Sequence, residues 1–237
     1  MTPVGTVGPL WHANDAAVVS FTENSVSTPY LFIAAYASNQ INYIVKLGMN
    51  AAGQYWEEAR YAMPGDFQFI SITLLSGGGT APAEFLIKNG KNFYTATVAN
   101  DTPNGQTLIP SQKFLWQKEN SEEKTDAFYN LYAAQGIQYE STTDTLYLAF
   151  YRKDGIKNQN KILSFSNIRW ACSNNYFDET IAPSNEWDIT KGTNTSVTFE
   201  VEGIGFRPGT SDNRLWFLTY EGSSSNGGIY TDSQSIR

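Results

Sequence analysis

The chain has 237 residues, of which 41% are hydrophobic and 16% are charged, and its net charge is −7. The apolar fraction is enough for a packed core, whereas the acidic balance and the lack of clustered Lys and Arg exclude a nucleic-acid-binding surface. No run approaches the roughly 18 apolar residues that a membrane-spanning helix needs, so we expect no membrane insertion.

Strand-forming runs follow one another along the whole chain. They are rich in β-branched and aromatic residues and lie at 18–21, 30–33, 67–72, 146–150 and 215–218. Turn clusters rich in Gly, Pro and Ser separate them, for example at 77–79 and 103–105. No window of about 12 residues keeps the apolar spacing of a helix, and the mixed charges at 118–124 are typical of a solvated loop. The sequence therefore predicts an all-β fold.

The predicted strands group into four similar units. Each unit opens with an Asp or a small polar residue and a first strand, at Asp15, Asp66, Asp126 and Ser196. A second and a third strand follow in every unit, and three units close with a Trp-bearing segment, at Trp56, Trp116 and Trp170. Residues 171–195 are interpreted as an insertion. Four such repeats predict a four-bladed β-propeller, with a five-bladed propeller and a β-sandwich as alternatives.

A propeller of this kind closes its ring without leaving a free sheet edge. The fourth unit lacks a closing Trp, and Trp11 near the N-terminus would supply one. We therefore expect residues 1–237 to form a single propeller domain in which the N-terminal segment 1–12 completes the last blade.

Several short motifs resemble the hemopexin-like four-bladed propeller family. They are the Asp-Ala starts at Asp15-Ala16-Ala17 and Asp126-Ala127-Phe128, the strand at 30–32 and the hairpin at 85–94. The resemblance spans nearly the whole chain and is closest to members without disulfides, such as the legume albumin-2 type and related lectins. Cys172 is the only cysteine, so no intramolecular disulfide can form. A second resemblance, at Arg214-Leu215-Trp216-Phe217 with Glu221, is to fungal fucose-binding propeller lectins.

The hemopexin-like resemblance implies an ion site on the propeller axis. Members of that family bind ions where the first residues of the inner strands converge on a narrow channel. The corresponding backbone carbonyl groups would be those near Ala16, Phe67, Ala127 and Val197. Carbonyl oxygens suit a hard cation, so Ca²⁺ or Na⁺ is the expected ion.

Aromatic residues beside polar ones mark three candidate ligand sites. A sugar-binding site places a Trp or Tyr ring against the apolar face of the sugar and polar groups at its hydroxyls. The three sets are Trp187 with Glu186 and Asp188, Trp56 with Glu57, Glu58 and Arg60, and Trp216 with Arg214 and Glu221. Packing in a core is the alternative for each Trp. Trp187 lies in a polar stretch and is the one that we most expect to be exposed.

No catalytic constellation stands out in the sequence. Glu57 and Glu58 are adjacent, so a strand would point them to opposite faces and they could not flank one glycosidic bond. His12 is the sole His, and Cys172 lies in an apolar context that favours a buried side chain over a reactive thiol.

These observations predict a non-catalytic binding protein, a lectin whose partners are glycans or glycoproteins. The alternatives are a small-ligand or polyamine-binding protein of the hemopexin-like type and a propeller enzyme such as a glycosidase. A homodimer is left open as the oligomeric state. The first ten residues lack a basic region and an apolar run, so the expected location is the cytoplasm or outside the cell by release without a signal peptide.

Overall fold

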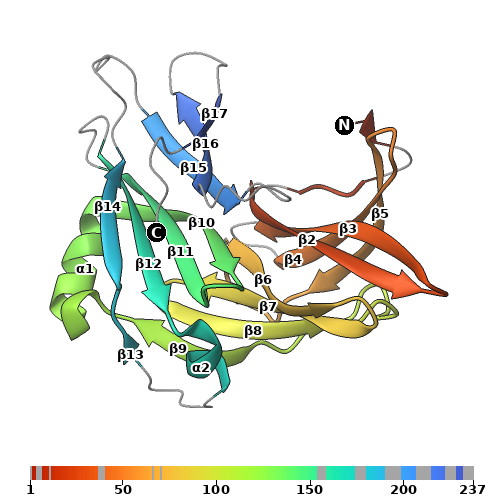
Figure 1. Ribbon diagram of the computed structural model, residues 1–237, viewed down its shortest axis with the longest axis horizontal. Helices are drawn as coiled ribbons and strands as arrows, with labels where there is room; N and C mark the ends of the chain where they lie inside the picture. Colours follow the sequence, from red (N-terminus) through yellow and green to blue (C-terminus); the bar gives the residue numbers. More distant parts are fainter. Residues whose placement is uncertain are drawn as a thin grey trace. The chain divides into compact units, whose positions relative to one another are not determined.

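The computed structural model consists mainly of β-strands (Figure 1). The structure describes residues 2–3, 7–10, 12–36, 41–65, 67–69, 71–153, 159–173, 180–189, 199–206, 215–221 and 228–231. These residues form four sheets in two compact units, one comprising Met1–Phe114 with Ala171–Phe177 and the other Leu115–Trp170 with Asp178–Arg237. We call them unit 1 and unit 2. The predicted all-β class is thus confirmed.

The first sheet belongs to unit 1 and has the strand order β1-β5-β4-β3-β2. Its strands are β1 (Thr2–Pro3), β2 (His12–Glu23), β3 (Val26–Tyr36), β4 (Tyr43–Met49) and β5 (Gln54–Ala62). Along β2, buried Ala17, Val19 and Phe21 alternate with exposed residues, as expected for a strand with one face in a core. Asn24 and Ser25 turn the chain into β3 with positive φ angles of 48° and 66°, which match the right-handed twist of a hairpin.

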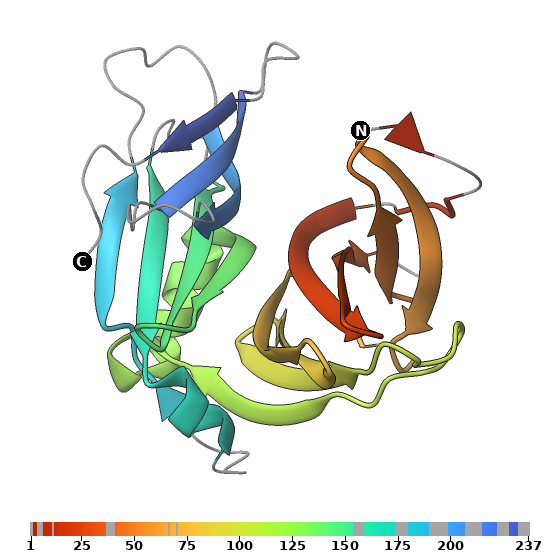
Figure 2. The same ribbon diagram turned by 45° about the vertical axis from the view of Figure 1, so that its right-hand side comes forward.

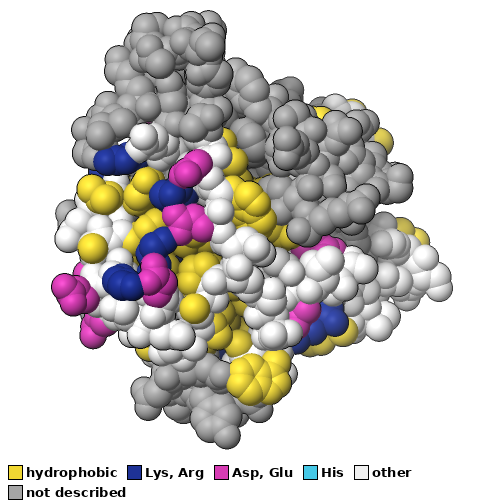
Figure 3. Space-filling view, turned by 60° about the vertical axis from the view of Figure 1, so that its left-hand side comes forward, with side chains coloured by type: hydrophobic (Ala, Val, Ile, Leu, Met, Phe, Trp, Pro, Cys, Tyr) yellow, Lys and Arg dark blue, Asp and Glu magenta, His cyan; other side chains and the backbone are white. Residues whose placement is uncertain are grey.

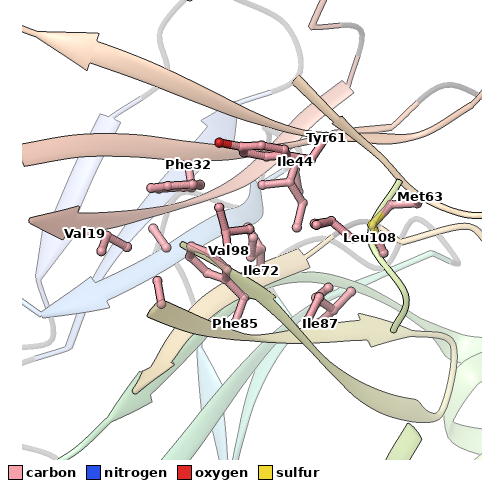
Figure 4. Packing of buried hydrophobic residues seen from close by; sticks show 14 of the residues in the cluster. Val19, Phe32, Ile44, Tyr61, Met63, Ile72, Phe85, Ile87, Val98 and Leu108 are labelled. Carbon is pink, nitrogen blue, oxygen red and sulfur yellow. The ribbon is translucent and has the colours of Figure 1, made fainter. Parts of the chain in front are cut away.

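The second sheet has the order β13-β9-β8-β7-β6. Its strands are β6 (Ser71–Gly78), β7 (Ala81–Asn89), β8 (Asn92–Val98), β9 (Ser111–Trp116) and β13 (Thr180–Ile181). In unit 1 its β6–β8 face packs on the first sheet, and the core between them contains Phe32, Ile44, Phe85 and Val98 (Figure 4). Single bridges from Phe21 to Gly79 and from Ala62 to Thr107 link the two sheets at their margins.

Unit 2 contains the third and fourth sheets. The third has the order β10-β11-β12-β14, with β10 (Tyr132–Glu140), β11 (Thr145–Arg152), β12 (Asn160–Ser166) and β14 (Asn185–Ile189). The fourth has the order β15-β16-β17, with β15 (Phe199–Phe206), β16 (Leu215–Glu221) and β17 (Gly228–Thr231). Tyr147 and Ile162 of the third sheet share a core cluster with Val201 and Leu215 of the fourth, which lies beside it (Figure 2).

Helices occupy a small part of the described chain. They are the short 3₁₀ helix η1 (Lys118–Asn120), α1 (Glu122–Leu131) and α2 (Ile168–Ser173). Trp116 and Phe150 pack against Phe128 and Tyr129 of α1, and Phe165 packs against Trp116. None of the helices in the described ranges has the length and apolar character needed to cross a membrane.

Each predicted unit contributes one sheet, but several predicted elements differ from the structure. The first strand expected at Asp126 is part of α1, and the solvated loop expected at 118–124 is η1 with the start of α1. Trp170 lies in α2 rather than in a closing strand. The fourth strand of the third sheet is instead β14, inside the segment interpreted as an insertion. Whether the four sheets form a propeller ring stays a prediction.

The N-terminal segment also differs from its prediction. Thr2 and Pro3 pair in parallel with Gln54 and Tyr55 of β5, so the described residues at this end join the first sheet and not the last. Trp11, the residue expected to complete the last blade, lies outside the described residues. Cys172 is buried, as predicted.

Candidate functional site

A half-buried tryptophan lies over a glycine on the inner face of the first sheet. The strand register aligns Tyr30 on β3, Gly48 on β4 and Trp56 on β5 in one row. A Cβ atom at Gly48 would lie 2.4 Å from Cε2 of the Trp56 indole, closer than any side chain tolerates. Glycine at this position therefore lets the indole lie across β4, between its own strand and Tyr30.

A buried lysine lies in the next row of the same face. Lys46 is only 5% exposed, and its Nζ donates hydrogen bonds to the carbonyl oxygen of Asn100 at 3.2 Å and to its Oδ1 at 2.9 Å. The same ammonium group lies 4.0 Å from the ring centroid of Tyr30, a cation–π contact. The Asn100 amide donates in turn to the carboxylate of Glu23. This network explains how a lysine is tolerated inside a sheet of apolar residues.

Glu58 adds a second carboxylate to this region. The pairing of β4 with β5 shifts between Lys46 and Leu47, where Glu57 and Ala59 are the paired residues, so Glu58 is the extra residue of a bulge. Burial raises the pKa of Tyr30, and the charges of Glu58 and Glu23 raise it further. Burial lowers the pKa of Lys46, whereas the same two carboxylates act to raise it. The Glu58 carboxylate therefore affects the pKa values of the same two groups, Tyr30 and Lys46, as Glu23 does.

The same face of the first sheet also carries a buried tyrosine hydroxyl group. Tyr61 is fully buried, and its hydroxyl forms no hydrogen bond within the described structure. Burial, together with the charge of Glu58 and the nearby Tyr30, raises the pKa of Tyr61 to about 12. Buried polar groups without partners are rare in native proteins and recur at functional sites. We call the whole set the Lys46 cluster; its members are Glu23, Tyr30, Lys46, Trp56, Glu58, Tyr61 and Asn100.

Glu57 and Arg60, two predicted ligand-binding residues, fasten the N-terminal segment instead. Arg60 donates from Nε and Nη2 to the two carboxylate oxygens of Glu57, at 3.0 and 2.9 Å. Glu57 accepts from the Gly8 amide at 2.8 Å, and Arg60 donates to the Pro9 carbonyl at 3.1 Å. The Arg60 hydrogen bond holds the pKa of Glu57 below its usual value, although burial acts to raise it. We call residues 7–10 the strap.

Beside the strap, the outer face of the first sheet carries a small apolar pocket. Its volume is about 200 Å³, and it is lined by Leu10, Leu31, Ile33, Leu47, Met49 and Tyr55. Leu10 belongs to the strap, so the Glu57–Arg60 pair also positions part of this lining. The pocket lies on the opposite face of the sheet from the Lys46 cluster.

Trp187 is not the exposed ring that its sequence context predicts. It pairs with Ile162 in the ladder between β14 and β12 and is half-buried. Its indole stacks on Tyr147 with ring centroids 6.4 Å apart, and it packs against the cluster between the third and fourth sheets. The prediction that Trp187 is exposed was therefore wrong, because alternate residues of β14 face a core. Its role in sugar binding stays a prediction.

Glu186 and Asp188, the predicted partners of Trp187, point to the other face of β14. Glu186 pairs with Lys118 and Lys161, and Asp188 pairs with Lys161 at 2.7 Å. Burial acts to raise the pKa of Glu186, but hydrogen bonds from both lysines lower it below its usual value. Acidic and basic side chains alternate across this face (Figure 3). Glu186 and Asp188 are therefore engaged in ion pairs with Lys118 and Lys161.

The third predicted sugar site is only partly described. Trp216 is half-buried on β16, and Glu221 ends that strand. Arg214 lies outside the described residues. The fucose-type site therefore stays a prediction.

The predicted axial carbonyl groups do not occupy equivalent places in the structure. Ala16 lies in β2 and Phe67 precedes β6, but Ala127 lies inside α1 and so does not begin an inner strand as expected. Val197 lies outside the described residues. Within the described ranges, no three His, Cys, Asp or Glu side chains gather to hold a metal ion. The Ca²⁺ or Na⁺ site stays a prediction.

Most of the Lys46 cluster escaped the sequence prediction, which named only Trp56 and Glu58 among its members at a candidate ligand site. One signal was available: Lys46 is the only charged residue in the apolar run of β4, and a charge inside a buried strand needs partners. The comparison of the sequence with protein-family models and with curated proteins gave no match. The residues of the site therefore carry the functional argument.

Proposed function

We propose that this protein is a non-catalytic carbohydrate-binding protein and that the Lys46 cluster is its binding site. The observation that carries the proposal is the row of Tyr30, Gly48 and Trp56, in which a half-buried indole lies over a glycine and a second aromatic residue lies in the same row. Aromatic faces of this kind stack on the apolar C–H face of a sugar ring.

The polar members of the cluster supply the second half of a sugar-binding site. Asn100 and the carboxylates of Glu23 and Glu58 offer acceptors, and the Asn100 amide offers a donor, for the paired hydroxyl groups of a sugar. Binding without catalysis fits the two adjacent glutamates, since Glu57 is engaged with Arg60 and Gly8 on the outer face. Glycans or glycoproteins are the partners that this chemistry favours.

A glycan array followed by calorimetry on the best ligand tests the proposal. We expect Trp56→Ala to weaken binding at least about tenfold, as for aromatic residues at the centre of a site, and Trp56→Phe to weaken it less. Trp170→Ala is the matched control, because Trp170 is 56% exposed and lies on α2 in unit 2. Thermal melts of all variants establish that they fold.

Two outcomes would contradict the proposal. One is an array on which no glycan binds the folded protein. The other is a bound glycan whose affinity is the same for the wild-type protein and for Trp56→Ala.

A further inference from the structure

The charges of the Lys46 cluster restrict what kind of ligand it accepts. It contains one ammonium group, on Lys46, and two carboxylates, on Glu23 and Glu58. Glu23 and Glu58 are exposed, whereas Lys46 is buried. A ligand approaching from solvent therefore meets the carboxylates first, and the ring faces of Tyr30 and Trp56 have negative potential as well.

Lys46 is poorly placed to bind an acidic ligand. Two hydrogen bonds hold its ammonium group to Asn100, and the Tyr30 ring lies against it. A ligand carboxylate or sulfate would have to displace Asn100 while lying close to Glu58 and Glu23. Bringing a negative charge close to these carboxylates is unfavourable.

An ammonium group suits the same place. Lys46 is itself an example of such binding. Its Nζ lies over the Tyr30 ring and donates hydrogen bonds to the side-chain and main-chain oxygens of Asn100, at 2.9 and 3.2 Å. Trp56 and Glu58, two positions apart on β5, offer a second aromatic face and a carboxylate, and Trp is the best cation–π partner among the aromatic residues. Glu58 has no hydrogen bond or ion pair among those found in the described residues, unlike Glu23, which accepts from Asn100.

We infer that the ligand of the Lys46 cluster carries a positively charged amino group, which docks between Trp56 and Glu58. The inference rests on the proposed function. Among carbohydrates, we expect the site to bind sugars with a free amino group in preference to N-acetylated or acidic sugars. A linear polyamine presents the same ammonium chemistry without a sugar ring, so the experiment must separate these two sources.

Calorimetry with four probes tests the inference. The probes are a β-1,4-linked glucosamine disaccharide, its N-acetylated counterpart, a sialylated lactose and spermidine. We expect the free amine to bind about tenfold more tightly than the N-acetylated disaccharide, as a charged hydrogen bond exceeds a neutral one, and its affinity to fall with added salt. The sialylated sugar should be the weakest of the three sugars.

Glu58→Gln should abolish the preference for the free amine, because it lowers the affinity for the free-amine disaccharide about tenfold more than the affinity for the N-acetylated disaccharide. Glu84→Gln is the matched control in the same unit, because Glu84 accepts a hydrogen bond from Ser76 on β6 and belongs to a different sheet. This control should keep the preference. Both exchanges conserve side-chain shape, so loss of folding does not confuse the result.

Each remaining outcome overturns a definite part of the argument. Equal or tighter binding of the N-acetylated or sialylated sugar, still dependent on Trp56, overturns the amine inference and leaves the carbohydrate function standing. Binding of spermidine alone, lost in Glu58→Gln, keeps the ammonium site and overturns the carbohydrate function. A preference that survives Glu58→Gln overturns the docking position.

Discussion

The buried hydroxyl group of Tyr61 lowers the free energy of unfolding. Its ring belongs to the core of unit 1, yet its hydroxyl group is buried without a hydrogen bond in the described structure. An unsatisfied buried hydroxyl costs about 1–3 kcal/mol of folding free energy. Tyr139 in unit 2 provides the contrast, since its hydroxyl donates to Asp144 at 2.8 Å.

We expect Tyr61→Phe to raise the free energy of unfolding by about 1 kcal/mol, because the exchange removes the unsatisfied hydroxyl and keeps the ring. Tyr139→Phe, the matched control, should lower the same quantity because it removes a hydrogen bond that is made. Urea denaturation measures both. Equal destabilisation by the two exchanges would mean that the Tyr61 hydroxyl has a partner.

Lys88, on β7, is also buried, with 1% of its surface exposed. Burial lowers the pKa of its ammonium group to about 7, from 10.5 in an exposed lysine. Between these two pH values the unfolded chain holds a proton that the folded chain has released. The free energy of unfolding therefore rises with pH across this window, and the full cost of burying the charge applies below pH 7.

The exchange Lys88→Met should remove this dependence. Relative to the wild-type protein, the variant has its largest gain in the free energy of unfolding below pH 7. This gain shrinks by about 1.4 kcal/mol per pH unit as the pH rises toward 10.5. Denaturation curves of both proteins across that range give the difference directly. A difference that does not change with pH would show that Lys88 stays charged in the folded chain.

At the scale of elements, the strap is held by few but specific contacts. Gly8 and Pro9 are tied to the Glu57–Arg60 pair, and a Cβ atom on Gly8 would lie 2.6 Å from Nη2 of Arg60. A larger residue at this position would therefore require the Arg60 guanidinium to shift. The sequence predicted a structural role for the N-terminal segment, but it assigned that role to the last blade.

Deletion of residues 1–12 tests which sheet depends on this segment. We expect faster amide hydrogen exchange in β5 and β4, since both the parallel pairing of Thr2–Pro3 and the strap contacts involve β5. Exchange in β10–β12 should stay unchanged. Faster exchange confined to β15–β17 would instead support the original prediction that the segment completes the last blade.

Local signals explain which elements the sequence could predict. Strands β3, β11 and β16 are apolar runs between turns and were predicted close to their observed positions. Helix α1 was missed because its ten residues include few apolar ones. Its start was visible, however, since Ser121 caps the helix by accepting a hydrogen bond from the Lys124 amide and two glutamates follow it.

At the scale of the whole molecule, the four sheets follow the order of the four predicted repeats, although only three strands of the last are described. The pattern of strands is local and therefore visible in the sequence. The Lys46 cluster is not, because it combines residues of β2, β3, β4 and β5 with Asn100 beyond β8. Strand register decides which of these side chains meet, and a single-residue bulge such as that at Glu58 changes it.

The burial of Trp116 gives unit 2 its own optical reporter. Its indole is fully buried among Phe128, Tyr129, Phe150 and Phe165, and its Nε1 donates to the Tyr129 hydroxyl at 3.0 Å. An indole in such surroundings fluoresces at shorter wavelength than one in contact with water, as Trp56 in unit 1 is in part. A variant that retains Trp116 but not Trp56 would report the unfolding of unit 2 through its emission wavelength. A variant that retains Trp56 but not Trp116 would report ligand binding in unit 1 in the same way.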